Sequence, residues 1–216
     1  MAQDRLKIWE TLFQKALQVI DSADATVFRP ETWTFGGGTV LMRRYRHRLS
    51  KDIDIFVPDP QYLGYVSPRL NDTVDKLTSK YIQGSLFLKL YFDEGEVDFV
   101  ASPPLTKIPT AVETLFDRQV RVETSAEILA KKIKHRGAEF TARDIFDFAL
   151  VAEKEPAALA KVRPLIREKR DAILARIASS DKILRQTFAE LEVLDYRRTY
   201  DECLSIVRKV LDPQSH

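Results

Sequence analysis

Two aspartates in an alternating acidic and apolar segment are the strongest candidates for chemistry in this chain. Residues 52–57 read Asp-Ile-Asp-Ile-Phe-Val, and Pro58 ends the segment. Side chains alternate between the two faces of a strand, so Asp52 and Asp54 would point the same way and repel each other. A divalent cation removes such repulsion, and Mg²⁺ prefers hard oxygen ligands. The pair therefore predicts a metal site.

Asp98 is the candidate for a third carboxylate. It lies in the second of two β-prone runs, 85–92 and 96–100, which are joined by a short loop that ends at Gly95. This pattern predicts a hairpin. A third acid on a neighbouring strand would complete a site for two metal ions, which can activate an attacking hydroxyl and stabilise a leaving pyrophosphate.

Three consecutive glycines precede the two aspartates. The β-prone residues 32–35 lead into Gly36, Gly37 and Gly38, and the chain from Thr39 to residue 45 favours a helix. Adjacent glycines let backbone N–H groups approach a phosphate, and a helix N-terminus attracts anions. By itself, a glycine run is more often a flexible turn, and a lone Asp-x-Asp is more often a solvated strand. Their occurrence together, in this order, favours a nucleotide site.

A second group of charged residues lies further along the chain. Lys132 and Arg136 are four residues apart on a predicted helix, so both can face one anion, such as a triphosphate. Asp144 and Asp147 are three residues apart on the next predicted helix. They either take part in the chemistry or form structural ion pairs with Lys132 and Arg136. The residues alone leave both interpretations open.

Two other lysines of the same helix are expected at the surface. Lys131 follows Glu127 by four residues, which predicts an exposed ion pair on the helix. Lys134 is expected on the same solvated basic face.

A basic segment precedes the aspartates, with five cations in nine residues: Arg43, Arg44, Arg46, Arg48 and Lys51. Such a segment is either a solvated helix face or a surface that guides an RNA backbone, with Tyr45 available for stacking. The residues alone leave these alternatives open as well.

The remaining elements follow from hydrophobic periodicity and capping residues. We expect an N-terminal helix from residue 6 to about residue 22, a helix over 68–80 capped by Ser67, and a short strand over 119–122.

Almost every segment after residue 124 has helical character. Capping sequences occur at Thr124-x-x-Glu127 and Thr141-x-x-Asp144, and Pro156 and Pro164 are expected to begin further helices. The sequence therefore predicts an α/β region over 1–123 and a helical region over 124–216.

Composition limits the class of protein. The chain has 216 residues, and its 34 basic and 32 acidic residues leave a net charge of +2, which is too balanced for a dedicated nucleic-acid coat. No apolar run approaches the roughly 20 residues that span a membrane. The single cysteine cannot form an internal disulfide, so we expect a reduced, cytoplasmic setting and no membrane partner.

These motifs resemble those of a known superfamily. The segment Gly36-Gly37-Gly38-Thr39 followed by Arg48-x-Ser50-x-Asp52-x-Asp54 resembles the first motif of the polymerase-β-like nucleotidyltransferases. The later stretch from Glu127 to Arg136, followed by Arg143-Asp144-Ile145-Phe146-Asp147-Phe148, is similar to the AbiEii branch, which contains abortive-infection toxins and the related MenT-type toxins.

The resemblance implies an α/β (α+β) nucleotidyltransferase core with a mixed sheet, followed by a helical C-terminal region. It implies transfer of a nucleoside monophosphate from an NTP, with release of pyrophosphate. Some relatives act on the 3′ end of tRNA, and the antitoxin of such a toxin would be encoded separately. Two alternatives stay open: a non-catalytic module that binds RNA or a partner on the same fold, and a nucleotidyltransferase that acts on a small molecule or a protein.

The resemblance also assigns roles to residues. Mg²⁺ would be held by Asp52, Asp54 and Asp98. Lys132, Asp144 and Asp147 would complete the catalytic set. The nucleotide would be bound by Gly36, Gly37, Gly38, Thr39, Arg48, Ser50, Lys132 and Arg136.

Overall fold

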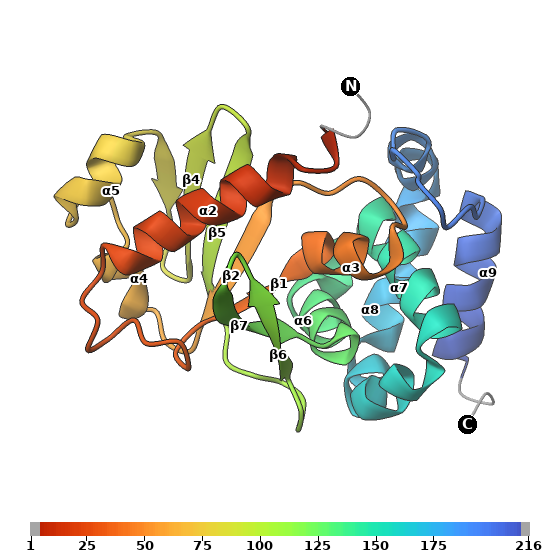
Figure 1. Ribbon diagram of the computed structural model, residues 1–216. Helices are drawn as coiled ribbons and strands as arrows, with labels where there is room; N and C mark the ends of the chain where they lie inside the picture. The colour runs from red at the N-terminus through yellow and green to blue at the C-terminus, as the bar shows by residue number, and fades with distance from the viewer. Residues whose placement is uncertain (1–4, 213–216) are drawn as a thin grey trace. The chain divides into compact units, whose positions relative to one another are not determined.

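The computed structural model describes residues 5–212, which form two compact units (Figure 1). The sheet unit contains the chain up to Val40, Ser50–Pro104 and Thr110–Glu123. The helical unit contains Leu41–Leu49, Leu105–Pro109 and the chain from Thr124 onward. Two short segments from the first 123 residues, 41–49 and 105–109, are therefore grouped with the helices.

The sheet unit is built on one seven-stranded mixed sheet, with the strand order β3-β4-β5-β2-β1-β7-β6. β2 pairs with β5 and β1 pairs with β7 in parallel, whereas the other neighbours are antiparallel. This confirms the predicted mixed sheet followed by helices. The strands are β1 Thr34–Gly36, β2 Ile53–Val57, β3 Tyr81–Gln83, β4 Phe87–Phe92, β5 Gly95–Ala101, β6 Thr110–Leu115 and β7 Arg118–Glu123.

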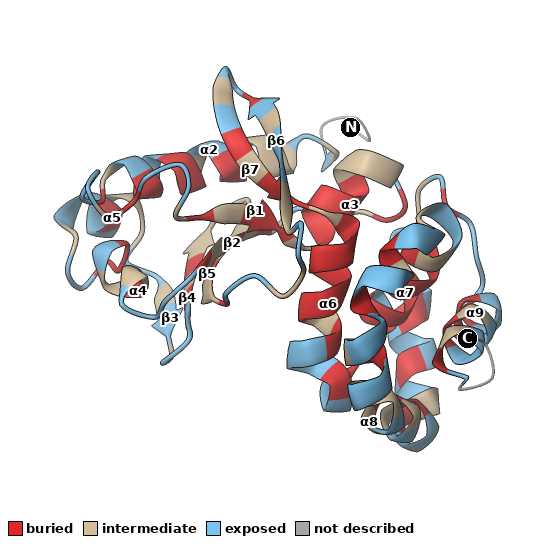
Figure 2. Ribbon diagram, turned by 90° about the horizontal axis from the view of Figure 1, so that it is seen from below, coloured by how far each residue is buried: buried red, intermediate tan, exposed pale blue. Residues whose placement is uncertain are grey.

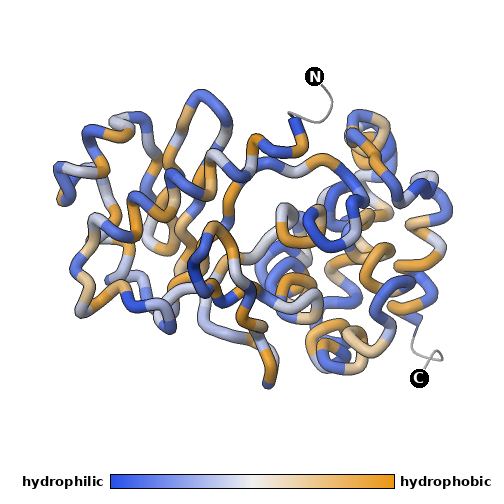
Figure 3. Tube along the Cα trace, in the orientation of Figure 1, coloured by the Kyte–Doolittle hydropathy of each residue, from blue (hydrophilic) through white to orange (hydrophobic). Residues whose placement is uncertain are grey.

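Helix α2 (Ile8–Asp21) covers the apolar face of this sheet. Apolar and polar residues alternate along the helix at helical spacing, which leaves one buried stripe (Figure 3). Phe13 of this stripe packs against Phe35 of β1, with ring centroids 4.7 Å apart. The helix ends at the cap residue Ser22, as the periodicity predicts.

The β4–β5 hairpin agrees with the sequence prediction, but β3 and β6 were not expected. In the β6–β7 hairpin, the turn residues Phe116 and Asp117 adopt positive φ angles of 51° and 59° without a glycine. The sequence therefore lacks the usual signal of a tight turn.

The predicted helix over 68–80 is wrong. α5 is limited to Asp72–Leu77, and its cap is Asn71, whose side chain accepts hydrogen bonds from the N–H groups of Thr73 and Val74. The hydroxyl of Ser67 instead donates to Gln83 Oε1 (2.7 Å), and one short helix, α4 (Tyr62–Tyr65), lies upstream.

The helical unit contains α6 (Ser125–Arg136), the 3₁₀ turn η1 (Gly137–Glu139), α7 (Ala142–Lys154), α8 (Pro156–Ala189) and α9 (Tyr200–Leu211). Their buried faces form a shared core (Figure 2). The capping box of Thr141 and Asp144 is present. Pro156 begins a helix as predicted, but Pro164 lies inside α8 rather than at a helix start. No helix of the described chain is long and apolar enough to cross a membrane.

Candidate active site

The strand register of the sheet unit brings the predicted acids into one row. Asp54 of β2 pairs with Gly36 of β1 and with Asp98 of β5, and Asp98 pairs with Lys89 of β4. Paired residues of neighbouring strands point to the same face and lie about 5 Å apart. We call Asp98 and Asp54, with Lys89 and Gly36 on either side of them, the carboxylate row. It lies on the face opposite the buried Ile53 and Ile55.

Asp52 lies just before β2, beside this row. Its Oδ1 atom accepts a hydrogen bond from the N–H of Glu96 (3.3 Å). Burial raises the pKa of Asp98, and the charges of Glu96 and Asp52 add to this effect against the opposing effect of Lys89. Asp98 Oδ1 is buried and has no hydrogen-bond partner among the described residues. These acids therefore act on one another electrostatically.

Lys89 is a site residue that the sequence analysis missed. Its Nζ atom donates to Asp98 Oδ2 (2.9 Å) and also contacts the carboxylate of Glu96. Burial opposes its charge, but the two carboxylates outweigh burial and raise the pKa of Lys89. The alternating pattern of β4 places Lys89 on the polar face, and the predicted hairpin pairs its strand with the strand of Asp98, so a signal for Lys89 was available.

The glycine turn approaches two carboxylates closely. Gly37 has a φ of +75°, and a Cβ there would overlap the Asp54 carboxylate. A Cβ at Gly36 would overlap the carboxylate of Glu123. The two carboxylates therefore leave no space for a side chain at either position. A side chain there would also block the approach of a phosphate to the turn.

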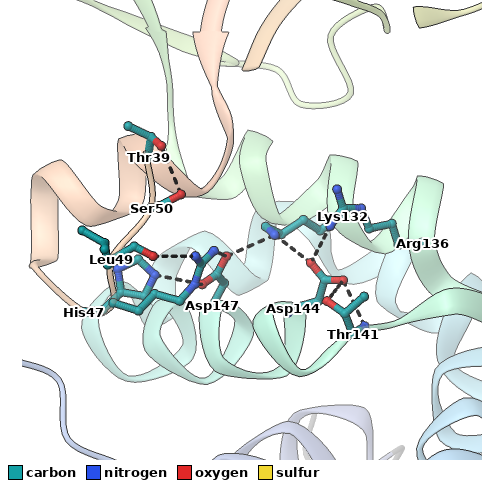
Figure 4. Close-up of polar contacts among 10 residues, drawn as sticks. Thr39, His47, Leu49, Ser50, Lys132, Arg136, Thr141, Asp144 and Asp147 are labelled. Atoms are coloured by element: carbon teal, nitrogen blue, oxygen red, sulfur yellow. Dashed lines mark hydrogen bonds and ion pairs between the residues drawn. The ribbon is translucent and has the colours of Figure 1, made fainter. Parts of the chain in front are cut away.

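Helix α3 (Gly37–Tyr45) begins in this turn, with Gly38 buried in its first turn. Thr39 is fully buried, and its Oγ1 atom donates to the backbone carbonyl of Asp52 (2.6 Å) and lies 3.1 Å from Ser50 Oγ (Figure 4). Thr39 and Ser50 thus tie the glycine turn to the segment that carries Asp52.

Glu123, at the end of β7, is a second residue that the sequence analysis missed. It is 1% exposed, and its Oε1 atom accepts a hydrogen bond from Thr34 Oγ1 (2.8 Å). Glu123 directly follows the predicted strand 119–122, and an acid at that position would have been a usable signal.

The helical unit contains a separate buried ion-pair cluster, centred on Asp147 (Figure 4). Arg48 binds the fully buried Asp147 carboxylate in bidentate fashion, through Nε and Nη2 at 2.8 Å each. His47 Nε2 lies 2.8 Å from Asp147 Oδ1, and Lys132 Nζ lies 3.1 Å from Oδ2. Burial raises the pKa of Asp147, but Arg48, Lys132 and His47 outweigh it and hold that pKa well below its usual range.

Asp144 completes the ion-pair cluster. Its Oδ1 atom accepts from Lys132 Nζ (2.7 Å) and lies 3.4 Å from Arg136 Nη1, whereas its Oδ2 atom accepts from the N–H and hydroxyl of Thr141. The ion pairs with Lys132 and Arg136 that the residues suggested are present. Lys132 is 11% exposed and bridges both acids, while the Arg136 side chain remains 51% exposed.

The expectation of an exposed Glu127–Lys131 pair is wrong. Both side chains are buried and their charged atoms lie 3.9 Å apart. The Glu127 carboxylate accepts hydrogen bonds from the N–H groups of Leu105 and Thr106 (2.9 Å each). Lys134 is exposed as expected.

Of the five cations in the basic segment, Arg48 is buried, Arg43 and Arg44 are half-buried, and Arg46 and Lys51 are exposed. His47 and Arg48 are buried in the ion-pair cluster, Arg46 Nε pairs with Asp195 (2.7 Å), and the Tyr45 hydroxyl contacts Glu155. The Tyr45 hydroxyl is thus engaged, while the residue as a whole is half-buried.

The acids near the glycine turn fit a hard divalent cation. Asp52, Asp54 and Asp98 offer only oxygen donors, and Asp98 Oδ1 has an unmet hydrogen-bonding capacity. No three acidic, histidine or cysteine side chains of residues 5–212 converge into a complete metal cage. Mg²⁺ is usually held by one or two carboxylates together with substrate phosphates, so a pair such as Asp52 and Asp54 is sufficient.

A mixed sheet with an Asp-x-Asp strand beside a glycine turn defines the nucleotidyltransferase class. Residues 21–209 match the family model described as "Nucleotidyl transferase AbiEii toxin, Type IV TA system". The chain therefore belongs to the AbiEii nucleotidyltransferase toxin family. No curated protein matches its sequence.

Solved structures resemble this chain at low sequence identity, and MenT4, the one of the three below with a TM-score above 0.5, shares its fold. MenT4, a nucleotidyltransferase toxin from Mycobacterium tuberculosis, is 16% identical with a TM-score of 0.52, over 98% of this chain and 86% of that one. JHP933 from Helicobacter pylori is 14% identical with a TM-score of 0.44, over 96% and 95% of the two chains. The antibiotic-resistance factor ANT(2'')-Ia is 15% identical with a TM-score of 0.48, over 85% and 98%.

Gly37→Ala tests the close approach of Asp54. The positive φ and the overlap with the carboxylate should together lower the free energy of unfolding by about 1–3 kcal/mol. Urea denaturation measures this change. Gly64→Ala is the matched control, because its Cβ would meet Leu70 Cδ1 at an ordinary 3.7 Å. Equal stability of wild type and Gly37→Ala would contradict the geometry.

His47→Gln tests the electrostatics of the ion-pair cluster. Burial, aided by Arg48 and Lys132, lowers the pKa of His47 despite the opposing effect of Asp147. The unfolded chain therefore takes up a proton near pH 6.5 that the folded chain does not, so stability falls as the pH drops below that value.

Between pH 7 and 5.5 the wild type should lose up to about 1 kcal/mol more unfolding free energy than His47→Gln, whose amide keeps a donor for Asp147. Urea denaturation at several pH values measures the difference. Parallel pH profiles for the two proteins would show that His47 is not held neutral.

Proposed function

We propose that this nucleotidyltransferase moves a nucleoside monophosphate from an NTP to a hydroxyl of RNA, with the 3′ end of tRNA as the favoured acceptor. The observation that carries the proposal is the carboxylate row: Asp54 and Asp98 are in register on parallel strands, and Gly37 approaches Asp54. Acids at this spacing serve phosphoryl-group chemistry when a divalent cation is bound.

Residues of the sheet unit would bind the metal ion, orient the phosphates and accept a proton. Asp52 and Asp54 would hold Mg²⁺, which when bound neutralises the triphosphate and stabilises the leaving pyrophosphate. The backbone N–H groups that begin α3 would orient the phosphates. Asp98 would accept the proton of the attacking hydroxyl, with Lys89 holding its carboxylate in place.

We propose separate roles for the charged residues of the helical unit. Arg136, whose guanidinium is half exposed, is open to an anionic ligand. Lys132 and Arg48 are engaged with buried acids, and we assign them the role of fixing Asp147 and Asp144 in place. Removing one partner from such a buried network leaves an uncompensated charge.

The family supports a role as the toxin of a toxin–antitoxin system. We propose that the antitoxin is encoded separately and that the enzyme acts in the cytoplasm, where NTP and RNA are both available.

Asp54→Asn tests the proposed function. Incubation with each α-labelled NTP, Mg²⁺ and total RNA should place label in RNA, and Asp54→Asn should reduce transfer at least about a hundredfold because charge stabilisation is lost. Gel analysis identifies both donor and acceptor.

Asp93→Asn is the matched control, since Asp93 is an exposed residue of the β4–β5 turn. It should transfer label at the wild-type rate. Label in a protein or small molecule instead of RNA would refute the proposed acceptor, and full activity of Asp54→Asn would refute the site.

A further inference from the structure

A cavity of about 450 Å³ opens on the helical unit, between the end of α6, the first turn of α7 and the later turns of α8. Three arginines from these three helices line it: Arg136, Arg143 and Arg176. Its volume lies in the range of small-molecule sites. Neither the proposed transfer reaction nor the family resemblance assigns a role to Arg143, Arg176 or the cavity.

The three guanidinium groups keep positive charge available. Arg176 is oriented by neutral acceptors, the carbonyl of Phe140 (3.3 Å) and the hydroxyl of Ser180 (2.7 Å). Arg143 is exposed and forms no ion pair within residues 5–212. Arg136 makes one long contact with Asp144 (3.4 Å). The N-terminus of the 13-residue α7 adds positive potential at the same place.

Apolar side chains also line the cavity. Ile183, Leu184 and Leu191 line it, and Ile183 is 57% exposed. Glu190 is the one carboxylate among the ten lining residues, so cations outnumber acids three to one. Paired arginines beside an apolar wall suit a ligand that combines a phosphate with a flat, weakly polar ring.

We propose that this cavity binds a phosphorylated nucleotide unit, with Arg143 and Arg176 on the phosphate and the Ile183 side of the cavity against the ribose and base. The ligand chemistry is shared by two sources, a free nucleotide and a nucleotide within an RNA strand. The proposal concerns binding and does not depend on which acceptor the enzyme uses.

Binding without divalent cations separates this cavity from the metal-dependent site. In EDTA, nucleotide binding that requires Mg²⁺ at Asp52 and Asp54 is removed, whereas binding to arginines persists. Calorimetry with ATP and fluorescence anisotropy with a short labelled oligoribonucleotide would then measure the two sources in parallel.

Arg143→Glu is the decisive variant. Position 143 is in the first turn of α7, where a negative side chain is favourable, so the helix should remain folded. Reversal of a phosphate-contacting charge should weaken binding at least about tenfold. Arg143→Ala should also reduce the dependence of oligoribonucleotide affinity on log salt by about one unit.

Arg167→Glu is the matched control, an exposed arginine of α8 with no ion pair within residues 5–212 and outside the cavity lining. It should change affinity less than about twofold. Weakening of both ligands by Arg143→Glu would identify a free-nucleotide site, and weakening of the oligoribonucleotide alone would identify an RNA-strand site.

Equal affinities of Arg143→Glu and Arg167→Glu for both ligands would overturn the proposal. Because no turnover is measured, that result would leave the transfer reaction standing. Conversely, an inactive transfer assay would not alter these binding curves.

Discussion

The close approach of the Asp54 carboxylate to the backbone at Gly37 constrains the rest of the sheet unit. A side chain at Gly37 has neither the space nor a favourable φ angle, so the chain must turn there through glycine before α3 begins. The same approach fixes β1 against β2, with Gly36 opposite Asp54, and the parallel pairing of β2 with β5 then places Asp98 beside it. Asp54 and Asp98, whose negative charges repel one another, are thereby held side by side. This arrangement favours the binding of a cation, and of a polyphosphate with it, beside the two carboxylates.

A second constraint operates within the helical unit, where Asp147 is completely buried. A buried carboxylate is tolerated only when its charge is compensated and its oxygens are hydrogen-bonded. Arg48, His47 and Lys132 meet both requirements, and Lys132 extends the compensation to Asp144. This dependence explains why His47 and Arg48, at the end of a segment rich in cations, are buried. It also leaves Arg136, at the end of α6, as the member of the ion-pair cluster with most exposure to an incoming ligand.

The sequence predicted those features that depend on local patterns. Alternation predicted β2, the glycine run predicted the turn before α3, and Thr141-x-x-Asp144 predicted a capping box. Features that depend on distant partners could not be predicted in this way. Glu127 of α6 is buried and accepts a hydrogen bond from the N–H of Leu105, which the local pattern of α6 does not reveal. Lys89, by contrast, lies opposite Asp98 within the predicted hairpin and was overlooked. β6 was not predicted because the turn that follows it contains Phe116 and Asp117 with positive φ angles and no glycine.

Nucleotidyl transfer differs from phosphoryl transfer in the phosphate that reaches the acceptor, and this difference offers the most direct test. Parallel incubations would use NTP labelled at the α-phosphate and NTP labelled at the γ-phosphate, each with Mg²⁺ and RNA. The account predicts that the α label becomes attached to the acceptor and that the γ label is released as pyrophosphate. Attachment of the γ label to the acceptor would contradict the account.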